Sequence, residues 1–272
     1  MLVCAVGDLL LDVIVRLEGA SASDDDTPAS TYVTAGGQAA NVAAWAVALG
    51  ADARLIAKRG EDGASRLAEA EVSARGVEIV GPVVPAAGGV VVSIVDGSGG
   101  RSMLTDRGPS PQLRADEIDV EWLRGSDVLH VSGYSLLDGA IAEAGARAAG
   151  AARAQGAQIS VDLASARGIA AFGPAKLLAR LEHLEPDIVF AGKRELEALG
   201  CEPPSATLVM KHAARGATVV QEGTREEHAA LPADVVDPTG AGDALAAGFL
   251  VGGIELGLAA AARCVAQVGA MP

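Results

Sequence analysis

The chain has 272 residues, half of them hydrophobic, and a formal net charge of −14 from 21 basic and 35 acidic residues. This length is sufficient for one large core, and the hydrophobic content excludes extensive disorder. No basic run exceeds two residues, which excludes nucleic acid as an expected partner, because a phosphate backbone is bound by clustered lysine and arginine.

Cysteine usage and hydropathy bear on the cellular compartment. The three cysteines, at positions 4, 201 and 264, are far apart and form neither a metal pattern nor a disulfide framework. This usage favours a reduced, cytoplasmic protein. The most apolar late stretch, 244–254, is 11 residues long and too short to cross a bilayer, so we expect no membrane partner.

Short apolar runs alternate with alanine-rich segments along most of the chain. In chain order we expect strand 2–7, helix 36–50, strand 53–58, helix 63–76, hairpin 89–105, strand 127–133, helix 138–155, strand 157–164, helix 174–184, strand 186–192, helix 194–200, strands 207–212 and 217–223, and a long helix from 243 that runs on, with a Gly-rich break, toward 268. Such alternation predicts an α/β fold, with a doubly wound, mostly parallel sheet covered by helices on both faces.

Two segments do not follow this rhythm. Residues 30–35 are β-rich, and the hairpin 89–105 turns around Gly97. They predict a small β-sheet lid over one edge of the main sheet, with lid segments at about 12–36 and 88–107 of a single domain spanning 1–272. The lid carries apolar side chains that could pair between subunits, so we also expect a homodimer formed through it.

The stretch DPTGAGDAL, residues 237–245, contains the most informative local chemistry. A turn of Gly240, Ala241 and Gly242 enters a helix and offers backbone N–H groups to an anion. Asp243 would repel a resting phosphate there, but it could take a proton from an alcohol that attacks phosphorus. The pattern therefore suggests phosphoryl transfer to a hydroxyl, although Asp243 could equally be a simple helix cap.

This stretch resembles the C-terminal signature of the ribokinase-like (phosphofructokinase B) carbohydrate kinases. Further motifs match in order: GDLLLD at 7–12, GGQAAN at 36–41, the DRG that begins at 106, PDIVFAGKRELEAL at 186–199 and the GA at 269–270. The resemblance covers essentially the whole chain. It implies the α/β fold with a lid, and ATP and Mg²⁺ as cofactors.

The resemblance also assigns roles to individual residues. Asp243 is implied as the catalytic base and Gly240, Ala241 and Gly242 as the anion hole. The substrate positions are Asp12, Gly36, Gly37, Asn41 and Arg107. The nucleotide positions are Lys211 and Gly216, Glu195 is implied to bind Mg²⁺ through water, and Asp237 and Thr239 mark a possible K⁺ site.

The sequence departs from the family pattern in places that bear on its substrate. The usual Asn-x-x-Glu motif has Gly192 in place of Asn, and a neighbour such as Asp162 or Lys193 could compensate. Leu10 and Gln38 replace two residues that read ribose in ribokinase, so ribose is not favoured. Three hypotheses stay open: a sugar kinase, a nucleoside kinase that holds its base with Tyr32, Met103 and Leu104, and a sugar-binding protein without turnover.

Overall fold

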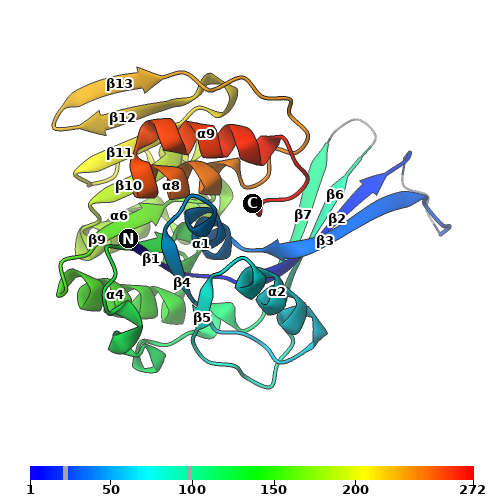
Figure 1. The fold of residues 1–272 in the computed structure, drawn as a ribbon, viewed down its shortest axis with the longest axis horizontal. Helices are drawn as coiled ribbons and strands as arrows, with labels where there is room; N and C mark the ends of the chain where they lie inside the picture. Colours follow the sequence, from blue (N-terminus) through cyan, green and yellow to red (C-terminus); the bar gives the residue numbers. More distant parts are fainter. Residues whose placement is uncertain (21–23, 97–99) are drawn as a thin grey trace.

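The computed structural model describes residues 1–20, 24–96 and 100–272, and contains a large and a small sheet (Figure 1). The large sheet has the order β13-β12-β11-β10-β9-β8-β1-β4-β5. Its strands are β1 (Leu2–Val6), β4 (Asp52–Ile56), β5 (Glu78–Val80), β8 (Val128–Ser132), β9 (Gln158–Asp162), β10 (Ile188–Gly192), β11 (Thr207–Lys211), β12 (Ala217–Gln221) and β13 (Thr224–His228). Neighbouring strands are parallel except in two pairs, β11 with β12 and β12 with β13, which are antiparallel.

Helices cover both faces of the large sheet. They are α1 (Gln38–Ala48), α2 (Gly63–Ala74), α3 (Gly133–Leu136), α4 (Gly139–Arg153), α5 (Ala166–Phe172), α6 (Pro174–Leu184), α7 (Lys193–Leu199), α8 (Ala241–Gly252) and α9 (Ile254–Val265). Strand β1 contributes Val3 and Ala5 to the core under α1, α8 and α9, and Cys4 and Val6 to the core under α4. This alternation follows from the two-residue period of a strand. The doubly wound α/β prediction is confirmed.

The order in which successive strands are added to the large sheet changes direction between the parallel strands β1 and β8. From β1 the sheet grows through β4 to β5 on one side, and from β8 through β9 and β10 to β11 on the other. In open α/β sheets, ligands collect outside the carboxyl ends of the strands at such a switch point. A Cβ on Gly7, which follows β1, would lie 2.9 Å from the Cβ of Ser132 at the end of β8, so the glycine allows the two strand ends to approach closely.

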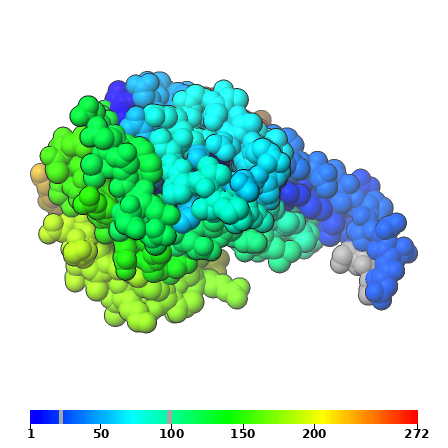
Figure 2. All heavy atoms as spheres, turned by 90° about the horizontal axis from the view of Figure 1, so that it is seen from below, coloured from blue at the N-terminus to red at the C-terminus, as the bar shows by residue number. Residues whose placement is uncertain are grey.

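The small sheet, called the lid sheet below, projects from the main body as an arm (Figure 2). Its order is β3-β2-β6-β7, with β2 (Leu10–Leu17), β3 (Ala29–Gly36), β6 (Gly89–Val95) and β7 (Arg101–Asp106). The register places Thr34, Asp12, Val91 and Thr105 in one row across the four strands. The predicted turn at Gly97 lies outside the described residues.

The last helices and the last strand compare differently with the sequence-based expectation. The helix expected from 243 toward 268 with a Gly-rich break is two helices, α8 and α9, separated by Gly253, which has a φ of 82°. Strand β13 has the sequence TREEH and is mostly exposed. It lacks the apolar alternation that marks a strand, and its pairing with β12 is what holds it in place.

Candidate active site

Asp243 lies in the first turn of α8 and is held from the opposite side by α1. Asn41 donates from Nδ2 to Asp243 Oδ2 at 2.7 Å. Burial raises the pKa of Asp243 to about 7, and the charge of Asp162 acts in the same direction. Hydrogen bonds from Asn41 and Gln38 and the charge of Lys211 oppose this rise. A carboxyl with a pKa near the working pH is suited to act as a general base.

The turn before Asp243 presents backbone donors. Gly240 is the N-cap of α8 with a φ of 76°, and a Cβ there would lie 2.5 Å from the Cβ of Ala270. Only glycine fits both constraints. The N–H of Ala241 turns to Pro238 O at 3.4 Å, whereas the N–H groups of Gly242 and Asp243 have no acceptor among the described residues. The helix start therefore keeps backbone N–H groups for an anion, and the anion-hole role of Gly240, Ala241 and Gly242 stays a prediction.

Lys211 supplies the cation beside this helix start. Its Nζ lies 2.6 Å from Oδ2 of Asp162, which is fully buried at the end of β9. A Cβ on Gly242 would lie 3.2 Å from the same Nζ. Burial disfavours the charged lysine, but the charges of Asp162, Asp243 and Glu195 outweigh it and raise the pKa of Lys211. A positive charge thus lies beside the backbone amides at the start of α8.

Asp12 and its glycine neighbour form the lid side of the site. A Cβ on Gly36 would lie 2.3 Å from the Asp12 carboxylate, so the carboxylate lies directly over this glycine. Burial raises the pKa of Asp12 to about 6, Arg101 lowers it and Asp237 raises it further. Gly37 has a φ of 99°, and a Cβ there would lie 2.4 Å from Asp8 O. This glycine allows contact with the backbone after β1.

Arg107 does not point freely into the site. Its guanidinium binds the carboxylate of Asp8 through two hydrogen bonds of 2.8 and 2.9 Å, and it lies 6.0 Å from the centre of the Tyr134 ring. Burial raises the pKa of Tyr134, and the charges of Asp243, Asp8 and Asp162 add to this rise. Arg107 is therefore anchored at the edge of the same group of charges.

The positions expected to serve the nucleotide and the metal are more dispersed. Gly216 forms a tight turn after β11, and a Cβ there would lie 2.0 Å from His228 O. Close packing against the backbone of His228 therefore requires a glycine at this position. The Glu195 carboxylate folds back over the start of α7, since a Cβ on Gly192 would lie 2.3 Å from its Oε2. No group of three or more His, Cys, Asp or Glu side chains arranged for a metal occurs in the described ranges.

The Asp237–Thr239 turn, expected as a K⁺ site, is already in contact with a cation of the chain. The guanidinium of Arg101, on β7, lies 3.2 Å from Asp237 Oδ1 and also donates to the Thr239 hydroxyl. Asp237 Oδ1 further accepts from the Thr239 N–H at 3.0 Å. The K⁺ ion was expected to bind through carbonyls near these residues, and Arg101 already supplies a positive charge at the neighbouring carboxylate, which disfavours a second cation there.

Three residues of this arrangement were assigned other roles, or none, from the sequence. Asp162, considered only as a neighbour that could compensate for Gly192, pairs with Lys211. Gln38, noted only as a departure at a ribose-reading position, accepts through Oε1 from Ser132 Oγ at 2.6 Å across the switch point. Arg101 makes the lid contact just described. Asp162 could have been weighed more heavily, because a carboxylate at the end of a buried strand is a signal for a site.

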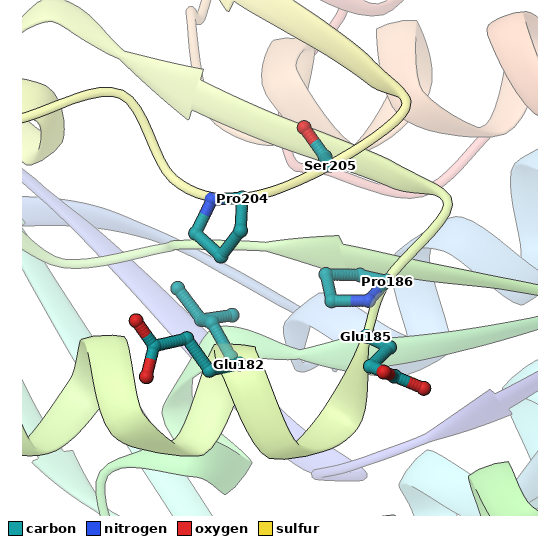
Figure 3. A pocket seen from close by; sticks show the side chains of 6 residues that line it. Glu182, Glu185, Pro186, Pro204 and Ser205 are labelled. Carbon is teal, nitrogen blue, oxygen red and sulfur yellow. The ribbon is translucent and has the colours of Figure 1, made fainter.

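A separate hollow of about 320 Å³ lies at the opposite edge of the large sheet (Figure 3). It is lined by Leu181, Glu182, Glu185, Pro186, Pro204 and Ser205. Pro186 and Ser205 precede β10 and β11, so this hollow is at the amino ends of the strands, away from Asp243. Its two carboxylates disfavour a phosphate ligand.

No helix in the part of the chain that the structure describes has the length and apolar character needed to cross a membrane.

Comparisons with known proteins agree with this geometry. The family model described as pfkB family carbohydrate kinase matches residues 1–271. An ATP-dependent ribose-1-phosphate kinase of Halopiger xanaduensis is 30% identical over 96% of this chain and 90% of its own. Fructokinase-1 of Zea mays is 30% identical over 92% of this chain and 82% of its own.

Solved structures share the fold. Adenosine kinase from Sinorhizobium meliloti superposes with a TM-score of 0.87 at 24% identity, covering 99% of this chain and 95% of its own. A candidate ribokinase II from E. coli, solved with ATP and Mg²⁺, gives 0.85 at 22% identity, covering 99% and 94%. The switch-point site and the family match over 1–271 lead to one conclusion: this chain belongs to the pfkB family of carbohydrate kinases.

Proposed function

We propose that this kinase transfers the γ-phosphoryl group of ATP to a hydroxyl of a small sugar or sugar-like alcohol. The observation that carries the proposal is the half-buried Asp243 carboxyl, whose pKa is raised to about 7, at the start of a helix with unpaired amides. Lys211 adds a cation beside the same helix start. Phosphoryl transfer to an alcohol needs a base, hydrogen-bond donors for an anion and a cation close together, and this site has all three.

Each group has a separate role in the proposed reaction. Asp243 accepts the proton of the attacking hydroxyl as the bond from the hydroxyl oxygen to the γ-phosphorus forms and the bond from that phosphorus to the bridging oxygen of ADP breaks, so that ADP leaves with the electron pair. The N–H groups of Gly242 and Asp243 stabilise the charge on the transferring phosphoryl group. Lys211 offsets the negative charge of the nucleotide, which a chain with net charge −14 must meet with local cations.

Magnesium fits this site through the nucleotide. Mg²⁺ usually keeps several waters and binds through one or two carboxylates together with substrate phosphates. Glu195 is half-buried near Lys211, and we assign the metal to it through water. When bound, Mg²⁺ neutralises phosphate charge.

The acceptor is placed on the inner face of the lid sheet, where Asp12 points. A partly buried carboxylate can accept hydrogen bonds from two adjacent hydroxyls. Asn41 adds an acceptor, because its Oδ1 is buried and has no donor among the described residues. The two curated relatives are named for a sugar phosphate and a sugar, which supports this substrate class.

A nucleoside acceptor is the second candidate. Tyr32 and Met103 lie in one row of the lid sheet with Ile14 and Ser93, on the face that carries Asp12. They are 48% and 54% exposed and could stack on a base. Leu104 lies on the opposite face and cannot take part.

The test is phosphate transfer from ATP across a panel of free sugars, ribose 1-phosphate and nucleosides. We expect turnover on a sugar or sugar phosphate, with kcat/KM at least about tenfold above that for nucleosides. Turnover on nucleosides alone would support the second candidate. Acceptor binding in calorimetry without any turnover would contradict kinase function for this chain.

The acidic limb of the pH profile should respond in opposite directions to two substitutions. Asn41→Ala removes a hydrogen bond that favours ionised Asp243, so the limb moves to higher pH by about 1–2 units. Asp162→Asn removes a neighbouring negative charge, so the limb moves to lower pH by roughly one unit. The measurement is kcat/KM from pH 5 to 9. Shifts in one common direction would remove Asp243 as the titrating base.

The outer face of the lid sheet supports the homodimer proposal. Val33, Val13, Val92 and Leu104 form one apolar row across its four strands, with Val33 41% and Leu104 59% exposed. We expect a dimer in light scattering at micromolar concentration and a monomer for Leu104→Asp. Val120→Asp, on the main body, is the control and should stay dimeric. A monomeric unsubstituted chain would refute the proposal.

A further inference from the structure

The lid sheet touches the turn before α8 through one arginine. Arg101 opens β7, and its Nε donates to Ser93 Oγ on the neighbouring strand at 2.8 Å. Its Nη1 lies 3.2 Å from Asp237 Oδ1, 136 residues away in the chain, and also donates to the Thr239 hydroxyl. Ser93 thus holds the guanidinium in the direction of the turn.

The turn holds a carboxylate that a positive charge stabilises further. Asp237 is 6% exposed, and removing the cation partner of a buried carboxylate is destabilising. Its oxygens accept from the Thr239 N–H at 3.0 Å, the Thr239 hydroxyl at 2.5 Å and the Gly269 N–H at 3.1 Å. Each of these donors is neutral, and Arg101 is the cation that contacts Asp237 in the described residues.

The turn also sets the position of the catalytic groups. Thr239 is followed directly by Gly240, which starts α8 and leads to Asp243. Gly269, which donates to Asp237, is adjacent to Ala270, and Ala270 packs against Gly240. Loss of the charge on this turn would therefore loosen both the segment before the helix and the segment that supports it.

We propose that Arg101 is a positioning residue that supplies the charge at the Asp237–Thr239 turn in place of a monovalent cation, and so joins the lid sheet to the anion-binding turn. Its kinetic consequence rests on the kinase function proposed above. Because Arg101 lies on the lid sheet that also carries Asp12, the contact connects the acceptor side of the site to the phosphoryl side. The enzyme then works without K⁺.

The test compares KCl with choline chloride at equal ionic strength, in the unsubstituted chain and in Arg101→Gln. The unsubstituted chain should have the same kcat and the same Tm in both salts. Arg101→Gln should lose about tenfold to a hundredfold in kcat in choline, with little change in KM for ATP, because a misplaced turn slows the transfer step. In KCl its Tm and kcat should both rise, since K⁺ can then bind the freed carboxylate and stabilise the fold.

Two further variants make the test specific. Arg101→Lys keeps the charge and should remain independent of K⁺. Arg225 lies on β13, and Arg225→Ala, which removes its exposed ion pair with Glu202, should change neither quantity. A K⁺-dependent kcat or Tm in the unsubstituted chain, full activity of Arg101→Gln in choline, or no gain in KCl for this variant would each overturn the proposal. If no acceptor is turned over, the kinase function fails, and the Tm comparison still decides the role of Arg101.

Discussion

Replacing Asp243 by asparagine should lower kcat by about 10²–10⁴-fold while raising the thermal stability of the protein above pH 7. Asparagine keeps the size of the side chain and its contact with Asn41, but it cannot accept a proton. The loss should appear in kcat rather than in KM for ATP. The measurement is steady-state kinetics with the best acceptor of the panel.

The gain in stability follows from the direction of the pKa shift. The pKa of Asp243 rises from 3.8 to about 7 on folding, chiefly because of burial. The folded state therefore holds this proton more tightly, and the resulting stabilisation is present in full below pH 3.8 and is lost as the pH rises through about 7. Asparagine carries no such loss.

The difference in unfolding free energy between Asp243→Asn and the unsubstituted chain should grow from pH 5 to about 7 and then level. One pKa unit corresponds to about 1.4 kcal/mol, so the growth is on the order of a few kcal/mol. Denaturant titrations at pH 5, 7 and 8 measure it. Asp116→Asn, at a fully exposed carboxylate, is the control and should leave kcat unchanged. Equal unfolding free energies of Asp243→Asn and the unsubstituted chain at pH 8 would contradict the prediction, because they would mean that the Asp243 carboxylate is as well solvated in the folded state as in the unfolded state.

The parts of this site that lie close together in sequence could be predicted. Gly240 and Asp243 share one turn, so a nine-residue motif contains both the bend and the base. Asp12 was predicted from the resemblance, and the structure places its carboxylate over Gly36. The alternating strands and helices predicted the doubly wound sheet for the same reason, because each element carries its own period.

The contacts that the sequence did not reveal join distant segments. Lys211 and Asp162 are 49 residues apart, and their pairing depends on β9 and β11 ending at the same edge on either side of β10. Arg101 and Asp237 meet only because the lid sheet packs against the turn before α8. With one sequence, nothing local distinguishes Arg101 from a solvated surface arginine.

The Lys211–Asp162 pair gives the second large expected effect, and it separates stability from catalysis. Lys211→Met leaves the Asp162 carboxylate buried without its cation, which should cost about 3–5 kcal/mol of unfolding free energy. It should also lower kcat by about 10²–10³-fold, because the cation beside the anion-binding amides is gone. Denaturant midpoints and single-turnover kinetics measure the two losses.

A double variant distinguishes the two roles of the lysine. Lys211→Met combined with Asp162→Asn removes both charges, so most of the lost stability should return, since the uncompensated carboxylate is what destabilises the single variant. Turnover should not return, because no cation then faces the phosphoryl group. Arg124→Met, at an exposed pair with Glu121, should affect neither quantity. Recovery of kcat in the double variant would mean that Lys211 serves only to neutralise Asp162. The helix amides and magnesium alone would then have to stabilise the negative charge of the phosphate.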